Sequence, residues 1–101
     1  MILYEVSVEV RADLCTAFVD YMRGKHLPEI LATGCFAHIR FDQTSETLYR
    51  TCYQAETEDD YERYLNQHAT TMRADFMQHF PEGCVPSRQV FRELFQLQRG
   101  Q

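Results

Sequence analysis

The order in which the hydrophobic period changes along the chain constrains the fold more than any other feature. From Ile2 to Val10, apolar residues occupy every second position, which is typical of a strand with one covered face. From Asp13 to Met22 they return every three or four residues, which predicts an amphipathic helix with Asp13 as its cap. A strand that leads into a helix therefore opens the chain.

Two residues interrupt the helical pattern soon after it begins. Gly24 weakens the interior of a helix, and Pro28 is tolerated only in a first turn. We therefore expect a kink or a helix-turn-helix at this point. The second helical segment would run from His26 to Thr33, and Gly34 would end it.

The rest of the chain repeats the alternation of strand and helix. Two strands are predicted over residues 35–42 and 47–56, and the four polar residues between them suit an antiparallel hairpin. Thr57 then begins a long helix over residues 58–80, with acidic residues in its first turn, where the helix dipole favours them. A further alternation over residues 87–97 predicts the fourth strand.

Together these elements predict one α+β domain over residues 1–101. The order strand-helix-strand-strand-helix-strand is that of a ferredoxin-like βαββαβ sandwich with a four-stranded antiparallel sheet. Right-handed crossovers place the first strand between the third and the fourth. A chain of 101 residues, 45% of them hydrophobic, is long enough for one core and too short for two ordinary domains.

The two faces of the predicted sheet differ in character. One face is apolar and is expected to lie beneath both helices, with Tyr53, Phe91 and Phe95 among its members. The other mixes large apolar side chains with complementary charges such as Glu5, a combination that suits neither open solvent nor a dry core. We therefore expect it to meet a second copy in a homodimer. The interface candidates are Phe36, His38, Leu48, Arg50, Val90, Arg92 and Leu94.

The charge, the hydropathy and the start of the chain bear on which partners the protein has and where it is located. Fifteen acidic residues against ten basic ones give a net charge of -5, and the basic residues are scattered, which disfavours nucleic-acid binding. No stretch approaches the roughly 20 apolar residues of a membrane-spanning helix. Met1 leads directly into a strand pattern without the features of an export signal, so a cytoplasmic location is expected.

The metal-ligating residue types show no site pattern. The four cysteines lack a C-x-x-C pair and a His at zinc-ligand spacing, so we expect them to be reduced, small apolar residues of the core. The four histidines form no recognised metal motif, and no cofactor motif occurs in the chain, so no metal and no cofactor are predicted. The cysteines are Cys15, Cys35, Cys52 and Cys84, and the histidines are His26, His38, His68 and His79.

Two runs of the sequence resemble a known family. The run from His26 to Phe36 and the opening Met1–Val6 resemble a small bacterial family of uncharacterised proteins, domain of unknown function 4286. The run Tyr64–Ala69, followed by Arg73, resembles the second motif of that family. The resemblance implies a dimeric α+β barrel, in which the sheets of two protomers face each other. Some members of that wider group are cofactor-free monooxygenases, isomerases or haem proteins, and others have no assigned role, so the fold transfers no reaction.

Four residues are candidates for ligand binding. His68 occupies the inward stripe of the long helix, where it is either fixed by a hydrogen bond in the core or kept within reach of a ligand. In the second case it would line a cleft with His26 and Tyr53, with imidazole as acid or base and phenol as hydrogen-bond donor. Arg73 or Arg50 is either a surface arginine or the group that holds a carboxylate or phosphate.

Two functional hypotheses follow from the sequence. In the first, a homodimeric α+β barrel binds a small apolar or acidic molecule in a cleft between helix and sheet, with or without enzymatic turnover. In the second, the protein is a non-catalytic association module, its sheet face is the whole functional surface, and the cleft is filled by side chains. An open cavity beside His68 would favour the first hypothesis, and a closed core would favour the second.

Overall fold

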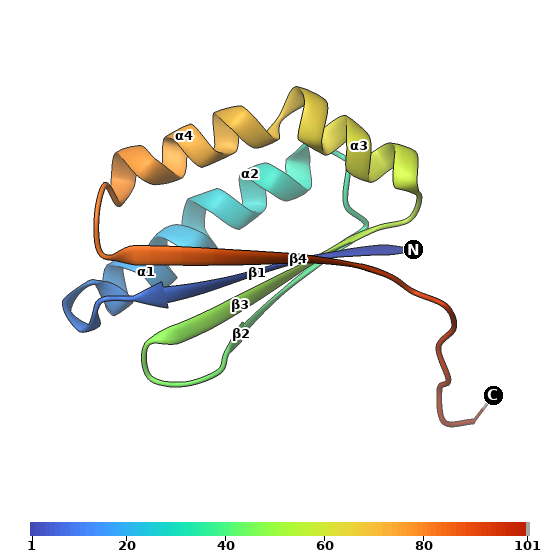
Figure 1. Ribbon diagram of the computed structural model, residues 1–101, viewed down its shortest axis with the longest axis horizontal. Helices are drawn as coiled ribbons and strands as arrows, with labels where there is room; N and C mark the ends of the chain where they lie inside the picture. The colour runs from blue at the N-terminus through green and yellow to red at the C-terminus, as the bar shows by residue number, and fades with distance from the viewer. Residues whose placement is uncertain (101) are drawn as a thin grey trace.

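The computed structural model describes residues 1–100 as one four-stranded antiparallel sheet with helices on a single side (Figure 1). This is the predicted ferredoxin-like α+β fold. The strands are β1 (Ile2–Val10), β2 (His38–Gln43), β3 (Leu48–Ala55) and β4 (Cys84–Arg92). The helices are α1 (Cys15–Tyr21), α2 (Leu27–Ala32), α3 (Glu58–Gln67) and α4 (Ala69–His79). Among these residues, no helix is both long enough and apolar enough to cross a membrane.

The strand order agrees with the order expected from right-handed crossovers. The sheet runs β2-β3-β1-β4, so β1 lies between β3 and β4 and is antiparallel to both. The β2–β3 hairpin is antiparallel as well. Strands β1 and β3 are therefore the central strands, and β2 and β4 are the edges.

The interruption expected at Gly24 and Pro28 is a π-helical turn over Met22–His26. The backbone stays helical across it, with φ and ψ of -61° and -48° at Met22 and -69° and -43° at Leu27, where α2 begins. The chain thus passes from α1 into α2 without a turn of the helix-turn-helix kind. Extra residues in such a turn shift the side chains that follow it, and these turns are frequent at functional sites. Gly34, with a φ of 77°, follows α2 as predicted.

The two predicted helix caps have different outcomes. The side chain of Thr57 accepts a hydrogen bond from the backbone N–H of Asp60 at 3.1 Å, which confirms it as the cap of α3. The prediction for Asp13 is wrong, because this residue lies inside a 3-10 turn (Ala12–Leu14) that precedes α1. Its carboxylate instead accepts a hydrogen bond from Nε of Arg11 at 2.6 Å.

The long helix predicted over residues 58–80 is two helices. His68 separates α3 from α4 with φ of -127° and ψ of -33°, although its N–H still bonds to the carbonyl of Tyr64 at 2.9 Å. The helical hydrophobic period continues across this position, so no local pattern indicates the break. The two helices take different directions over the sheet (Figure 1).

The fourth strand is shifted from its predicted position, and its faces are inverted. It spans Cys84–Arg92 and not residues 87–97. Val90 lies opposite Tyr4, and Phe91 lies opposite Leu3, so Val90 shares the helix side of the sheet with Tyr4. A phase error of one residue moves every side chain of a strand to the other face. Neither set of alternate residues in this edge strand is purely apolar, so alternation alone could not fix the phase.

Three interface candidates are misplaced by that error. Val90 and Arg92 lie on the helix side, where Arg92 pairs with Glu58 of α3 at 3.2 Å. Leu94 lies beyond the end of β4 and is 88% exposed, and Phe95, expected under the helices, is 77% exposed. Phe91, also expected there, faces the opposite side.

Phe36 is a further correction, because it belongs to the core. It is 3% exposed, and its ring centroid lies 5.2 Å from that of Tyr53 and 4.9 Å from that of Tyr64. The strand alternation used to place it does not apply, because β2 begins only at His38. The largest fully buried side chains of the same core are Phe18, Ile30, Val10 and Cys35.

The face of the sheet opposite the helices, called here the open face, carries the remaining interface candidates His38, Leu48 and Arg50. The guanidinium of Arg50 lies 2.9 Å from Asp42 and 3.8 Å from Glu5. Val85 and Phe91 of β4 lie on this face and are 69% and 41% exposed. The expected mixture of charge and apolar surface is therefore present, with a different contribution from β4.

Candidate functional site

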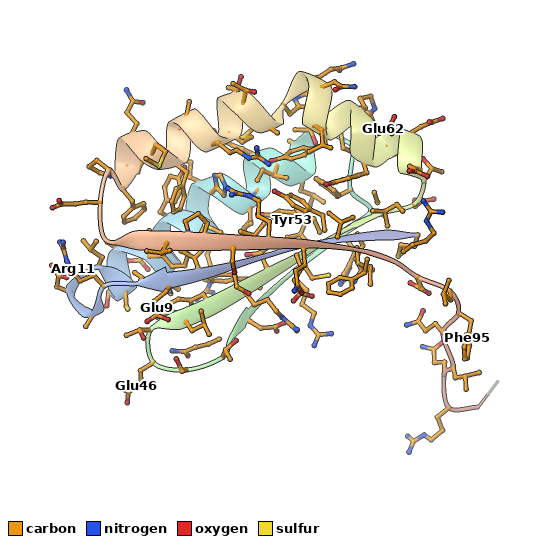
Figure 2. The ribbon with its side chains drawn as sticks, viewed as in Figure 1. Glu9, Arg11, Glu46, Tyr53, Glu62 and Phe95 are labelled. Atoms are coloured by element: carbon orange, nitrogen blue, oxygen red, sulfur yellow. The ribbon has the colours of Figure 1, made fainter. Side chains whose placement is uncertain are left out.

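A cavity of about 90 Å³ lies between the helices and the sheet, and we call it the cleft. Strands β1, β3 and β4 form one wall, and the π-helical turn and α4 form much of the other. The lining includes the ligand-binding candidates His26, Tyr53 and Arg73. Figure 2 shows Tyr53 in the layer between the sheet and the helices. Three of the four candidates are thus brought together at one site.

His68 is not among the cleft-lining residues within the described range 1–100. It lies at the break between α3 and α4, is partly buried, and has its ring stacked on Tyr64 with centroids 6.3 Å apart. His68 therefore stacks on Tyr64, which lines the cleft, without lining it directly in the described range, and a role for His68 in ligand binding stays a prediction.

Two arginines converge on one phenol at the edge of the cleft. The hydroxyl oxygen of Tyr4 accepts hydrogen bonds from Nη2 of Arg73 at 3.2 Å and from Nε of Arg88 at 3.1 Å. Arg73 comes from α4, Arg88 comes from β4, and the contact joins the two layers. The hydrogen bond to Tyr4 raises the pKa of Arg73 above its usual value.

Arg73 and Arg88 differ from other arginines of the chain in their hydrogen-bond partners. Over the residues described, neither Arg73 nor Arg88 forms an ion pair with a carboxylate, whereas Arg50 and Arg92 both do. A phenol oxygen has two lone pairs, and both are used here, so the phenol proton of Tyr4 is available for donation. Two guanidinium groups and one phenol O–H form a set of donors suited to an oxyanion.

A second polar group meets the cleft through His26. Nδ1 of His26 lies 3.2 Å from the hydroxyl of Tyr21, and that hydroxyl donates to Oδ2 of Asp75 at 2.6 Å. Lys25 donates to the same carboxylate oxygen at 3.0 Å. Burial lowers the pKa of His26 to about 4, and the hydrogen bond from Tyr21 lowers the pKa of Asp75. The imidazole is therefore neutral at pH 7, while the carboxylate is charged.

Aromatic side chains form the apolar part of the cleft. The rings of Tyr53 and Tyr64 have centroids 5.5 Å and 6.4 Å from that of Tyr4. Burial raises the pKa of Tyr64 to about 12 and also raises the pKa of Tyr53. These phenols are neutral at pH 7 and can act as hydrogen-bond donors. Met72 and Phe76 of α4 complete the apolar lining.

Sequence reasoning missed Tyr4, Arg88, Tyr21 and Asp75 as site residues. Tyr4 was correctly placed beneath the helices, but nothing in the sequence distinguished it from its neighbours on β1. Arg88 was hidden by the phase error in β4. Tyr21 and Asp75 are separated by 54 positions, so their contact could not be read from spacing.

The cysteines and histidines form no metal site in the part of the chain that the structure describes, where no cluster of three or more suitable side chains occurs. All four cysteines are free thiols there. Cys35 is buried as expected, whereas Cys15, Cys52 and Cys84 are only partly buried. Burial raises the pKa of Cys52 and of Cys84, which leaves these thiols protonated and poorly nucleophilic.

Comparison with protein families identifies the group to which this architecture belongs. The family model described as Domain of unknown function (DUF4286) matches residues 1–94, nearly the whole chain. The chain belongs to this family. No functionally curated protein matches it in sequence.

Solved structures with the same architecture include proteins with and without a described activity. A protein of unknown function from Nitrosomonas europaea superposes with a TM-score of 0.72 at 17% identity, covering 98% of this chain and 95% of the other. A cofactor-independent oxygenase from Streptomyces nogalater gives a TM-score of 0.67 at 12% identity, covering 95% of each chain. A dimeric ferredoxin-like protein from an uncultured marine organism gives 0.63 at 8% identity, covering 95% and 96%. At these identities the likeness shows the fold alone.

Proposed function

We propose that this protein binds a small anionic molecule in the cleft, with a carboxylate or phosphate group held by Arg73 and Arg88 and an apolar body among the aromatic side chains. The observation that carries the proposal is the convergence of two guanidinium groups on the hydroxyl of Tyr4 without a carboxylate partner among residues 1–100. This proposal follows the first of the two hypotheses drawn from the sequence.

Neither of the two arginines has a carboxylate partner among residues 1–100. The chain carries a net charge of -5, so carboxylates are abundant, yet none pairs with Arg73 or Arg88 in the described residues. A neutral phenol is a weaker acceptor for a guanidinium than a carboxylate or phosphate, which adds charge and bidentate geometry. A ligand oxyanion can therefore replace the phenol contacts at a net gain.

The size and lining of the cleft define the rest of the ligand. Its volume of about 90 Å³ is well below the roughly 300 Å³ at which drug-sized pockets begin, so the ligand is of metabolite size. Aromatic and methionine side chains form most of its apolar lining, including Tyr53, Tyr64, Met72 and Phe76. A planar or branched apolar group beside the acidic group matches this surface.

Titration calorimetry and thermal shift with benzoate, phenyl phosphate and the neutral analogue benzamide would test the proposal. A ligand that binds the folded state raises its stability by mass action, so the two anions should raise the melting temperature, and benzamide should not. The Arg73→Gln and Arg88→Gln variants should each weaken anion binding at least tenfold. Arg92→Gln is the matched control, because Arg92 lies on the same side of β4 but is paired with Glu58. Equal binding of benzamide and benzoate, or equal affinities in all the variants, would contradict the proposal.

Turnover without a tightly bound cofactor is part of the same proposal. The solved structure of a cofactor-independent oxygenase with the same fold supports it, because such a sheet-and-helix frame can carry chemistry in at least one other protein. The cleft of the present protein offers a neutral imidazole, phenol donors and an anion-binding pair, which are the ingredients of acid-base catalysis.

We also propose that the protein is a homodimer in which the open faces of two sheets meet. The open face carries partly buried Leu48 and exposed Phe91 around the paired charges of Arg50, Asp42 and Glu5. A self-complementary surface of this kind suits an interface between identical copies. The segment after β4 extends away from the body of the molecule and exposes Leu94, Phe95 and Leu97, so it provides further apolar surface for the same partner (Figure 1).

A further inference from the structure

The protonation pattern around Tyr21 follows from its two hydrogen bonds. The carboxylate of Asp75 has no proton to give, so the 2.6 Å contact requires the hydroxyl of Tyr21 to donate to it. Tyr21 has one proton, and its oxygen can therefore only accept from His26, whose Nδ1 lies 3.2 Å away. In the neutral imidazole the proton must then reside on Nδ1. Nε2 carries the lone pair.

That nitrogen has no hydrogen-bond partner in the described residues and is not sealed from solvent. Among the described residues, Nδ1 of His26 is hydrogen-bonded to Tyr21, and Nε2 makes no hydrogen bond. His26 as a whole is only 8% exposed and lines the cleft. Within residues 1–100, no sealed side-chain nitrogen or oxygen is left without a partner, so Nε2 is not sealed. Nε2 therefore keeps accessible surface, and it belongs to a ring that lines the cleft.

The surroundings of His26 keep the ring neutral but can support a positive charge. Tyr21 stacks on the ring with centroids 5.3 Å apart, and Phe76 lies 5.8 Å away. The charged and titratable groups that act on it are Asp75, Glu29, Lys25 and His79, with burial as the dominant influence and the two carboxylates favouring protonation. An anion bound in the same cleft adds another negative charge and favours the imidazolium further.

We propose that His26 is the proton acceptor of the cleft, with Tyr21 and Asp75 as positioning residues that hold its Nε2 lone pair toward the bound molecule. The substrate class is an anion that carries an acidic C–H next to a carbonyl group. The C–H bond breaks, its proton bonds to Nε2, and its electron pair stays on the substrate as an enolate. Return of the proton to another atom of the enolate gives the isomer, so no oxidant or reductant is required.

This inference rests on the proposed function, because it needs a ligand in the cleft, but it makes separate demands on the protein. The Tyr21–Asp75 contact should control which nitrogen of His26 is protonated, whether or not the arginine pair binds an anion. The arrangement is that of a base oriented by a third group, which is general to acid-base catalysis. Tyr21 and Asp75 thereby have a role in orienting His26 that neither packing nor surface charge requires.

The first test is a nitrogen-15 NMR measurement of the imidazole tautomer in the intact protein. His26 should be neutral at pH 7 with its proton on Nδ1, and Tyr21→Phe should shift the population toward the Nε2–H form. This test needs no variant for its main result, so it stands even if substitution of His26 disturbs folding. An Nε2–H tautomer in the unsubstituted protein would overturn the proposal.

The second test uses 5-nitrobenzisoxazole, a planar apolar probe of bases in pockets. Removal of its single ring C–H proton breaks the N–O bond and releases a coloured cyanophenolate, with no other reactant. We expect saturable turnover that falls at least tenfold in His26→Gln, and a shifted pH profile in Tyr21→Phe. His38→Gln is the matched control, because His38 is exposed on the open face. No rate above buffer in the intact protein, or an unchanged rate in His26→Gln, would overturn the proposal.

The two proposals fail in distinguishable ways. Anions that do not bind, together with the expected tautomer and probe turnover, would remove the arginine site and leave the proton acceptor. Anions that bind through Arg73 and Arg88 to a protein with the opposite tautomer would leave the binding function and remove the proton acceptor.

Discussion

At the scale of single residues, the hydroxyl of Tyr4 links the two layers of the molecule. It is the acceptor for both Arg73 and Arg88, and the ring that carries it is 4% exposed. Tyr4 pairs across the sheet with Tyr53 of β3 and with Val90 of β4, so its position is fixed from both sides. The proposed anion site thus depends on a central strand of the sheet.

Replacement of Tyr4 by phenylalanine should lower the free energy of unfolding by about 1 to 2 kcal/mol, because two charged donors lose their shared acceptor. The same change should also weaken anion binding, since the phenol donor is lost. Urea unfolding and titration with benzoate measure the two effects. Tyr61→Phe is the control, because the ring of Tyr61 lies 5.5 Å from that of Tyr4 but its hydroxyl makes no hydrogen bond in the part of the chain described. Equal losses in both variants would contradict the role given to Tyr4.

His26 should make the stability of the protein depend on pH in the mildly acidic range. Its pKa is about 4 in the folded protein and about 6.5 in the unfolded chain, so the unfolded chain binds the proton first as the pH falls. Stability is complete above pH 6.5 and decreases as the pH falls toward 4. Between pH 7 and pH 5 the loss from this residue should be about 2 kcal/mol.

Denaturant unfolding of the protein and of His26→Gln at both pH values isolates this contribution. The difference in unfolding free energy between pH 7 and pH 5 should be smaller in the variant by about that amount, since only the titration of His26 has been removed. His38→Gln should keep the full pH dependence, because His38 is exposed on the open face. A pH dependence of the same size in His26→Gln would show that other groups cause it.

At the scale of elements, the sequence predicted every strand and both helical regions, because their hydrophobic periods are set by burial against the core. It failed where a tertiary constraint replaced the period. The phase of β4 is fixed by its pairing with β1, which places Val10 opposite Cys84, and no local pattern records this pairing. The break at His68 likewise leaves the helical period nearly unchanged, whereas Gly24 and Pro28 indicated an interruption where the π-helical turn lies.

The proposed anion site was only half predictable for the same reason. Arg73 was found through a local motif, whereas its partner Arg88 depended on the face that β4 presents. His26 and Tyr53 both line the cleft, and Tyr53 was placed on the helix side by the clear period of its strand. Contacts across more than 50 positions, such as Tyr21 with Asp75, need the fold itself.

Gly24, in the π-helical turn between α1 and α2, and Gly34, just after α2, allow a matched test of backbone conformation. An added Cβ would meet nothing within 4 Å at either Gly24 or Gly34, so the two sites differ in backbone conformation and not in space. Gly24 lies inside the helical path with an ordinary φ, and Gly24→Ala should stabilise the protein by about 0.5 to 1 kcal/mol. Gly34 has a φ of 77°, so Gly34→Ala should destabilise it by about 1 kcal/mol.

Urea midpoints of the two variants, compared with that of the unsubstituted protein, check this prediction. The opposite signs are the essential result, because cavity or contact effects are the same at both sites. A loss of stability in Gly24→Ala would show that the π-helical turn requires glycine, contrary to its observed conformation.

At the scale of the whole molecule, helices cover one side of the sheet and leave the other side to solvent or to a partner. The likeness to a dimeric ferredoxin-like protein concerns the fold of one protomer and leaves the assembly of this chain to experiment. On the open face, Arg50 is already paired with Asp42 and Glu5 within one protomer. Such pairs lower the cost of covering them with an apolar partner surface, because no charge is buried alone.

The final prediction is that this protein sediments as a dimer at micromolar concentration and that substitutions on the open face dissociate it. Arg50→Glu places a third acidic group beside Asp42 and Glu5, and it should weaken the dimer by like-charge repulsion. Leu48→Glu should have the same effect through the apolar part of the face, without breaking any ion pair within the protomer.

Arg92→Glu is the control that separates the two faces. Arg92 was an interface candidate from the sequence, but the register of β4 places it on the helix side beside Glu58. It should therefore leave the dimer intact even though it reverses a charge on the same strand. Sedimentation velocity with circular dichroism of each variant distinguishes dissociation from unfolding. A monomer at high micromolar concentration would exclude the dimer, and dissociation by Arg92→Glu alone would move the interface to the helix side, where it would cover the cleft.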